Sequence, residues 1–338
     1  MPLLEAHDHE QFEIHCYADV LRPDEVTNRH RRAAEVWHDT LSDSHAELAE
    51  RIAADGIDVL VDLTMHMSGS RLLTFARKPA PVQVTWLAYP GGTGLDAMDY
   101  RISDRHMDPS DIQPSHYSER TVRLLDCWCC YDPLIDIPAA TVREGSSVTF
   151  GSLNNPCKIN DSLLRLWAKV LLAIENSRLL VQTISPEHSA RITELMGQVG
   201  IGAGRLDFVG RQPRVEYLRL YDRIDICLDP LPYNGITTTL DALWMGVPVV
   251  SLAGERAAGR AGLGILRTAG LGELGAETPE EFLKIANDLA RDSSRRGELR
   301  SSLRQRLAAS RLMDFPRFAR NMESAYRKMW RDWCSAGA

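Results

Sequence analysis

The side chains best suited to bind a ligand lie within residues 228–250. The apolar residues that end at Leu228 predict a buried strand, and the prolines and Asn234-Gly235 that follow predict a sharp loop. Thr237 and Thr238 then stand where a helix is expected to begin, and Asp241 follows one turn later. A helix N-terminus offers N–H donors and the positive end of a dipole, so it suits a nucleotide diphosphate, with the Asp241 carboxylate in reach of ribose hydroxyls. A Thr-Thr pair alone more often caps a structural helix, but the compact loop before it favours a nucleotide-binding edge.

Composition narrows the class of protein. The chain has 338 residues, which is enough for two domains, and its 44% apolar and 25% charged residues are typical of soluble globular proteins. A net charge of −7 argues against binding nucleic acid through its phosphates. No apolar run reaches the ~20 residues of a membrane span, so we expect no membrane partner and a cytoplasmic location.

The cysteine and histidine spacing predicts no metal site. The seven cysteines contain no pair of CxxC motifs of the kind that binds zinc, and the ten histidines contain no HExxH motif or comparable ligand spacing. The sequence therefore predicts neither a zinc site nor a disulfide framework.

Short apolar strands alternate with helical patterns along most of the chain, which predicts an α/β fold of two Rossmann-like, doubly wound domains facing a cleft. Strands are expected at residues 12–17, 57–63, 81–87, 100–104, 148–152, 178–183, 205–209 and 224–228. Helices are expected at residues 45–55, 70–77, 161–173, 186–199, 278–307 and 315–333. Residues 132–147 read as a linker between the domains.

Several ordered segments together resemble the catalytic region of the O-linked N-acetylglucosamine transferase and SPINDLY family, which has the GT-B fold. The matching segments are DVLVDLTMH (58–66), RKPAPVQVTWLAYPG (77–91), YSE (117–119), LNNPCKI (153–159) and the run 228–250. The likeness extends from about residue 12 to residue 333.

The resemblance implies an enzyme that moves a sugar from a nucleotide donor to a protein. It implies UDP-N-acetylglucosamine as the donor, Ser or Thr of an acceptor protein as the target, inversion at the sugar, and no metal or other cofactor. Three alternatives stay open: a GDP-fucose donor, as in SPINDLY-type members, Asn as the acceptor residue, or a non-catalytic fragment that binds only nucleotide. An NAD-type Rossmann enzyme fits poorly, because no strand is followed by GxGxxG with an acidic residue ~20 positions later.

Residue by residue, the resemblance places donor-binding groups in the second half of the chain. Lys158 matches the lysine that holds the diphosphate and aids departure of the leaving group. Thr237 and Thr238 match the phosphate-binding hydroxyls, and Asp241 matches the ribose-binding carboxylate. Asn155 stands where the family often has a glutamine that contacts the donor.

Further candidates flank these groups. Arg214 and Tyr217 lie in the region that contacts the nucleotide base, and Arg260 matches an arginine near the donor. In the first half of the chain, His66 resembles a histidine that faces the cleft, where it could contact the acceptor or the sugar. Gly91 is a further donor-binding candidate, because it belongs to a glycine-rich turn that allows the backbone to approach a ligand.

The resemblance also sets the expected domains. An acceptor-side domain would cover residues 1–140, the nucleotide-sugar domain 146–312, and a C-terminal helix at 315–334 would pack back on the first domain. Relatives begin the first domain with one more strand than this sequence shows, so this domain is expected to be incomplete and to lack its first strand.

Overall fold

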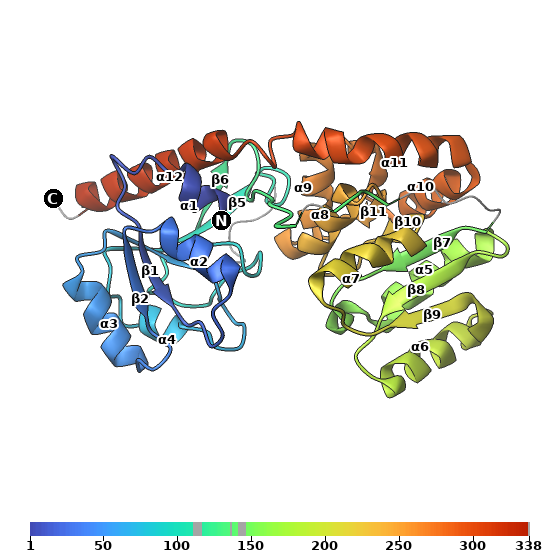
Figure 1. Ribbon diagram of the computed structural model, residues 1–338, viewed down its shortest axis with the longest axis horizontal. Coiled ribbons are helices and arrows are strands. Elements are labelled where there is room, and N and C mark those ends of the chain that lie inside the picture. The colour runs from blue at the N-terminus through green and yellow to red at the C-terminus, as the bar shows by residue number, and fades with distance from the viewer. Residues whose placement is uncertain (111–116, 136, 141–146, 337–338) are drawn as a thin grey trace. The chain divides into compact units, whose positions relative to one another are not determined.

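The computed structural model describes residues 1–110, 117–135, 137–140 and 147–336. The chain divides into two compact units (Figure 1): unit 1 contains Met1–Asp132 and Arg311–Ala338, and unit 2 contains Pro133–Ser310. Both units are mixtures of helices and parallel strands. None of the helices within the described ranges has the length and apolar character needed to cross a membrane.

Unit 2 is built on one sheet whose strand order is β12-β11-β10-β7-β8-β9. All its paired strands are parallel. The strands are β7 (Thr149–Ser152), β8 (Arg178–Gln182), β9 (Leu206–Val209), β10 (Ile226–Leu228), β11 (Val249–Leu252) and β12 (Gly275–Ala276). The chain runs outward from β7 to β9 and then crosses to the other side of β7 at β10. Ligands of such sheets bind beyond the carboxyl ends of the strands where the order reverses, here between β7 and β10.

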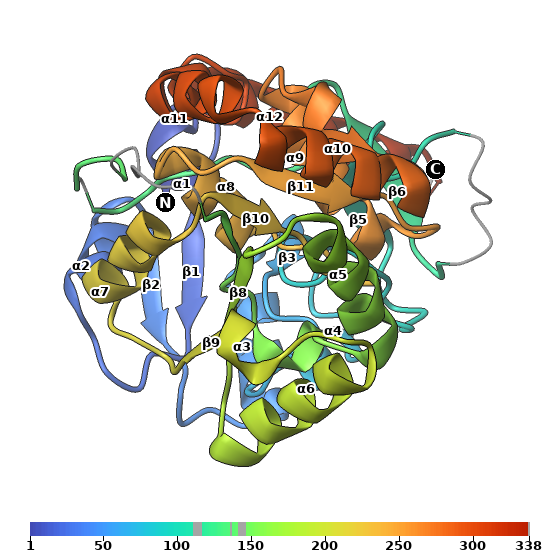
Figure 2. The ribbon, with the colours of Figure 1, turned by 90° about the vertical axis from the view of Figure 1, so that its right-hand side faces the viewer.

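Helices cover both faces of this sheet. They are α5 (Asp161–Ala173), α6 (Pro186–Gln198), α7 (Arg214–Arg219), α8 (Thr237–Trp244), α9 (Ala261–Thr268), α10 (Pro279–Arg291) and α11 (Ser293–Ala308). Figure 2 shows α5, α6 and α10 along one face and α7 and α8 along the other. Short 3-10 turns are η2 (Pro156–Lys158), η3 (Ala203–Arg205), η4 (Leu220–Arg223), η5 (Ala257–Gly259) and η6 (Gly272–Leu274).

The single helix predicted over residues 278–307 is wrong. The structure has two helices, α10 and α11, because Asp292 leaves the helical conformation with φ −100° and ψ 89°. Its carboxylate accepts a hydrogen bond of 2.9 Å from the Arg295 backbone N–H and so caps the second helix. Both helices carry many charged residues, so the pattern of apolar residues does not reveal where one helix ends and the next begins.

Unit 1 contains two parallel sheets, β1-β2 and β3-β4-β5-β6. The strands are β1 (His15–Ala18), β2 (Val36–Asp39), β3 (Val59–Asp62), β4 (Val82–Thr85), β5 (Tyr100–Asp104) and β6 (Arg120–Leu124). The helices are α1 (Pro2–Ala6), α2 (Glu25–Arg32), α3 (His45–Ala54), α4 (Leu72–Phe75) and α12 (Phe315–Ala336). No strand within the described ranges joins the two sheets.

The predicted strand at 100–104 matches β5, whereas β2 and β6 are not predicted. Both carry charged residues, and β6 begins at Arg120, so neither shows an apolar alternation. The strand predicted at 12–17 begins three residues later, at His15. These differences arise where tertiary contacts, such as α12 against β6, decide strand formation.

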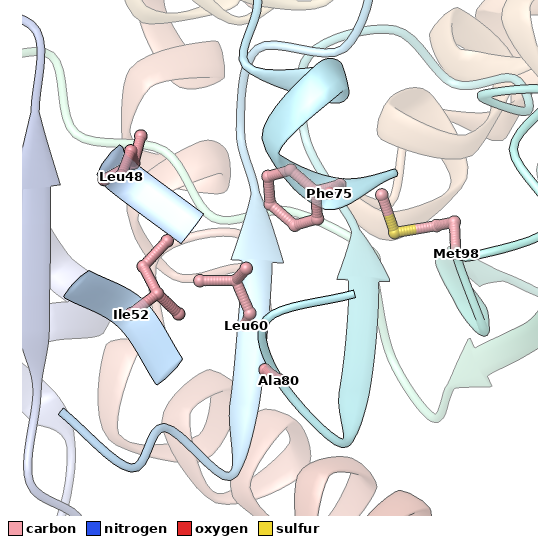
Figure 3. Packing of buried hydrophobic residues seen from close by; sticks show 6 residues of the cluster. All are labelled: Leu48, Ile52, Leu60, Phe75, Ala80 and Met98. Carbon is pink, nitrogen blue, oxygen red and sulfur yellow. The ribbon is translucent and has the colours of Figure 1, made fainter. Parts of the chain in front are cut away.

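One core cluster of unit 1 joins α3, β3 and α4 (Figure 3). Its buried members are Leu48, Ile52, Leu60, Phe75, Ala80 and Met98. Tyr17 of β1 packs against the cluster as a partly buried neighbour, so β1 shares this core with α3 and β3.

The C-terminal helix α12 packs on unit 1, against α1, β4 and β6. Phe318 lies against Trp86, with ring centroids 5.9 Å apart. Arg317 binds Asp126 through two hydrogen bonds of 2.6 and 3.0 Å. These contacts hold the C-terminal helix against residues of unit 1 that lie more than a hundred positions earlier in the sequence.

Candidate functional site

The loop between β10 and α8, residues 229–236, is held by two buried polar side chains. Asp229 is 2% exposed and accepts hydrogen bonds from the Ser251 hydroxyl (2.6 Å) and the Gly235 N–H (2.7 Å). Asn234 is fully buried; its side-chain amide donates to Pro230 O (2.8 Å), and its Oδ1 accepts from Gly262 N (3.2 Å). The loop is therefore shaped by internal bonds before any ligand arrives.

Lys158 lies at the end of η2, just after β7, and reaches this loop. Its Nζ donates to the Asn234 carbonyl at 2.7 Å and lies 3.6 Å from the centre of the Tyr233 ring. An ammonium over an aromatic face is stabilised by the ring quadrupole. The two contacts fix the cation beside the loop that leads into α8.

Lys158 and Asp229 have shifted pKa values for the same reason. Burial lowers the pKa of Lys158 to about 8, and the nearby Asp229 charge opposes that shift. Burial raises the pKa of Asp229 to about 6, against the hydrogen bonds from Ser251 and Gly235 and the charge of Lys158. At pH 7 both groups carry charge, so Lys158 presents a partly desolvated cation.

The start of α8 brings the two predicted threonines to the carboxyl ends of β7 and β10. Thr237 is exposed and Thr238 is half-buried. The Thr238 hydroxyl donates to Asn154 Oδ1 at 2.7 Å. A Cβ on Gly235 would lie 2.8 Å from that same Oδ1, so only glycine lets the loop pack this closely. The threonines thus stand at the amino end of α8, where helix N–H groups and dipole favour an anion.

Arg214, Tyr217 and Asp241 form a second group. Asp241 is 1% exposed, and both its oxygens accept hydrogen bonds from Arg214, at 2.6 and 2.7 Å. The Arg214 guanidinium also lies 5.5 Å from the Tyr217 ring centre, and burial raises the pKa of the Tyr217 hydroxyl. In this conformation Arg214 occupies both Asp241 oxygens, so a ribose hydroxyl would have to share the carboxylate with Arg214.

Arg260 and Asn155 lie near the same loop. Arg260 follows η5, donates to Gly254 O at 3.2 Å, and precedes Gly262, which binds Asn234. Asn155 is exposed, and its Oδ1 accepts from Cys157 N at 3.1 Å. It therefore caps η2, the turn that carries Lys158.

Two predicted residues belong to unit 1. His66 is exposed on the loop after β3, where the carboxylate of the buried Asp62 accepts hydrogen bonds from the N–H groups of Thr64 (3.0 Å) and Met65. Met65 has a φ of 42°, a conformation that costs energy for a non-glycine residue. The Asp62 bonds hold this turn and so fix the position from which His66 extends.

Gly91 lies after β4 and is buried. Its carbonyl accepts from Arg101 Nε at 3.2 Å, and a Cβ at this position would lie 2.5 Å from the Tyr89 ring. Arg101 is itself 2% exposed and pairs with Asp108 at 2.9 Å. The glycine-rich turn is thus held in place by Arg101, which is itself fixed by its buried ion pair with Asp108.

Four residues of the unit 2 site are not among the predicted site residues: Asn154, Asp229, Tyr233 and Asn234. Asp229 follows a buried strand directly, which is a usable signal for a polar group at a sheet edge. The roles of Asn154 and Tyr233 depend on contacts with Thr238 and Lys158, and these contacts join segments that are distant in sequence.

The sequence matches the family described as Glycosyl transferase family 41 over residues 2–132 and 142–322. Among similar proteins, one from Arabidopsis thaliana named probable UDP-N-acetylglucosamine–peptide N-acetylglucosaminyltransferase SPINDLY is 38% identical over 97% of this chain and 37% of its own length. Another from the same plant, with the same enzyme name and the label SEC, is 29% identical over 97% of this chain and 35% of its own length. The chain therefore spans little more than a third of these relatives.

Solved structures give a consistent result. A variant of the O-GlcNAc transferase of Thermobaculum terrenum superposes with a TM-score of 0.92 and 42% identity, over 100% of this chain and 65% of that one. A structure of Alr3699/HepE from Anabaena superposes with a TM-score of 0.56 at 10% identity over 96% of this chain and 94% of that one, a likeness of fold alone. The predicted GT-B fold class and the predicted family are confirmed.

Proposed function

Because the chain belongs to glycosyl transferase family 41, we propose that it is the catalytic part of a protein glycosyltransferase. It would transfer N-acetylglucosamine from UDP-N-acetylglucosamine to Ser or Thr hydroxyls of an acceptor protein. Relatives at 38% and 42% identity carry names of this activity. A nucleotide sugar and an acceptor protein are then its partners, and the cytoplasm is the expected compartment.

The observation that carries the proposal is the position of Lys158. Its ammonium binds Asn234 O at 2.7 Å, three residues before the first turn of α8. A diphosphate at that helix terminus would accept hydrogen bonds from the α8 N–H groups and the Thr237 hydroxyl, and would lie beside the Lys158 charge. Arg260, on the segment that packs against the loop, would add a second cation.

In the proposed reaction the acceptor oxygen attacks the anomeric carbon of the sugar from the face opposite the diphosphate. A new carbon–oxygen bond forms while the bond from that carbon to the β-phosphate oxygen breaks, which inverts the configuration. The hydroxyl proton leaves with a base or with water, and UDP departs with the bonding electrons. Negative charge grows on the β-phosphate, and a fixed ammonium stabilises that charge more in the transition state than in the bound donor.

On unit 1, we assign His66 and Gly91 to the acceptor or sugar side of the reaction. His66 is exposed on a turn held by Asp62, so its imidazole is available to a ligand. Gly91 would let the backbone approach the sugar. No metal takes part in this proposed transfer, because Lys158 and the α8 terminus supply the positive charge that the leaving group needs.

Calorimetric titration of the purified chain with UDP, with GDP as the comparison, tests the donor. UDP-selective binding followed by transfer of labelled N-acetylglucosamine to Ser/Thr peptides is the expected result. A folded chain that binds neither nucleotide would overturn the donor assignment. Binding of UDP without transfer would support a chain that only binds nucleotide.

GDP-fucose is the second candidate donor. The chain is 38% identical to the SPINDLY-labelled relative and 29% identical to the SEC-labelled one, and the resemblance associates SPINDLY-type members with that donor. Selective binding of GDP, with transfer of fucose, would replace the first proposal by this one.

The affinity for UDP is expected to depend on pH through the charge of Lys158. Only the charged ammonium attracts the diphosphate, and the pKa of Lys158 is about 8, so affinity should fall as pH rises through that value. Between pH 7 and pH 9 the charged fraction drops about tenfold, and the UDP dissociation constant should rise by about that factor. The diphosphate stays ionised in this range, since the second phosphate pKa is about 6.

Calorimetry at the two pH values measures this change. Lys158→Ala serves as the control, and its weaker affinity should be the same at both pH values. A wild-type affinity that does not change from pH 7 to pH 9 would remove the Lys158 charge from donor binding.

A further inference from the structure

Two histidines and one aspartate of unit 1 converge on one point: His15 of β1, His38 of β2 and Asp55, which follows α3. One ligand atom from each lies within 4.8 Å of the others, and the three residues are half-buried. The register pairs Tyr17 with His38 and His15 with Val36, so His15 and His38 are diagonal neighbours on the same face of the two strands. We call these three residues the His15 cluster.

His15 has the hydrogen-bond pattern of a ligand histidine. Its Nε2 lies 3.1 Å from Glu13 Oε1. If Nε2 carries the proton, Nδ1 has a free lone pair, and this atom is buried without a hydrogen-bond partner in the described part of the chain. Metal-binding histidines usually donate their second N–H to a carboxylate in this way, which fixes the tautomer and strengthens the ligand.

His38 and Asp55 complete the arrangement. His38 Nε2 lies 3.0 Å from Asp55 Oδ2, yet within the described residues it has no partner with hydrogen-bond geometry. Asp55 Oδ2 accepts a hydrogen bond of 2.7 Å from the Tyr17 hydroxyl, and the Tyr17 ring stacks on His38 at 5.1 Å between centroids. Tyr17 therefore orients both side chains from outside the cluster.

A simple His38–Asp55 ion pair explains part of this geometry. It leaves the buried Nδ1 of His15 without a function, and an unpaired buried polar atom is costly. A cation between the three residues would satisfy both orphaned nitrogens and the carboxylate at once.

We propose that the His15 cluster binds a first-row divalent transition-metal ion of the Zn²⁺ type, with water in the fourth position. Two imidazoles and one carboxylate are a ligand set that Zn²⁺ and Fe²⁺ accept. Zn–ligand distances of about 2.0–2.2 Å require ligand atoms about 3.4 Å apart, so the 4.8 Å set needs only a small closure of side chains.

The ion would cross-link β1, β2 and the end of α3, the helix that shares the core cluster with β3. Asp55 precedes β3 and His66 follows it, so the ion lies at the opposite end of that strand from the loop that carries His66. We therefore assign it a structural role, independent of sugar transfer. The sequence predicts no metal because the three ligands are widely spaced, and only strand pairing brings them together.

The test is titration of the untagged, metal-free full chain with Zn²⁺ alone. Calorimetry measures the binding, and thermal unfolding with and without Zn²⁺ measures the effect on stability. One equivalent should bind and raise the unfolding temperature, and EDTA should reverse the shift. His15→Gln, His38→Gln and Asp55→Asn should each weaken Zn²⁺ binding by at least tenfold, with Glu13→Ala weakening it by about tenfold through the loss of its support to His15.

Co²⁺ identifies the ligands and keeps the test independent of folding stability. Imidazole and carboxylate ligands give visible ligand-field bands without the near-ultraviolet sulfur band that any of the seven free thiols would produce. His30→Gln, on the surface of α2, is the matched control and should leave the Zn²⁺ affinity unchanged. Binding that survives all three ligand variants in folded protein, binding with a thiolate band, or no binding at all would overturn the proposal.

Discussion

Replacing Lys158 by alanine is expected to reduce sugar transfer by at least 10²-fold to 10³-fold while unit 2 stays folded. The loss is that of a single preorganised charge at a site where negative charge develops, which has about this magnitude in other enzymes. Its Nζ is held by Asn234 O at 2.7 Å and lies 3.6 Å from the centre of the Tyr233 ring, so the variant loses a charge whose position is fixed by the loop.

The fold should tolerate this change because the ammonium is already destabilised by burial, as its pKa of about 8 indicates. Its hydrogen bond and its contact with the ring contribute about 1–2 kcal/mol, which the variant loses. Asp229 keeps its bonds from Ser251 and Gly235, so the loop retains its shape.

Transfer rates and circular dichroism of both forms measure the prediction. Lys169→Ala, an exposed position on α5, is the control for loss of one positive charge and should keep full activity. A Lys158→Ala protein with wild-type turnover would show that leaving-group stabilisation comes from elsewhere.

Replacing Arg214 by alanine is expected to destabilise unit 2 by about 3 kcal/mol, near the low end for breaking a buried ion pair. The variant leaves Asp241, which is 1% exposed, without its two hydrogen bonds from Arg214. The Arg214 side chain is 30% exposed, so some water can replace it, and this limits the cost.

Amide hydrogen exchange of β10 and β11 reports this loss within unit 2. Arg219→Ala, an exposed arginine on the same helix, should leave exchange unchanged. The double variant with Asp241→Ala should recover part of the stability, because it removes the stranded carboxylate. Exchange in Arg214→Ala equal to that of the wild type would mean that the pair contributes little.

Asp241→Ala alone tests whether Asp241 binds the ribose. Asp241→Ala should weaken UDP binding, since the variant removes the carboxylate proposed to bind the ribose and releases Arg214 from its two hydrogen bonds. An Asp241→Ala protein that is folded and binds UDP with unchanged affinity would exclude Asp241 from the donor site.

Local sequence patterns are enough to predict many of the helices and strands and the start of the helix that we propose binds phosphate. The helix at 161–173 is predicted with the bounds of α5, because its apolar spacing and its Asn160 cap are local features. The start of α8 at Thr237 follows in the same way from the strand, the loop prolines and the hydroxyl residues.

Contacts between side chains that are distant in sequence depend on the tertiary fold. The Arg214–Asp241 pair, the Thr238–Asn154 bond, the contact of Lys158 with Tyr233 and the His15 cluster each join segments that no local pattern relates. Likewise β6, which carries Arg120 and Arg123, becomes a strand because β5 pairs with it and α12 packs against it. Backbone conformation follows from neighbouring residues, whereas these contacts depend on strand order and on the desolvation that packing imposes.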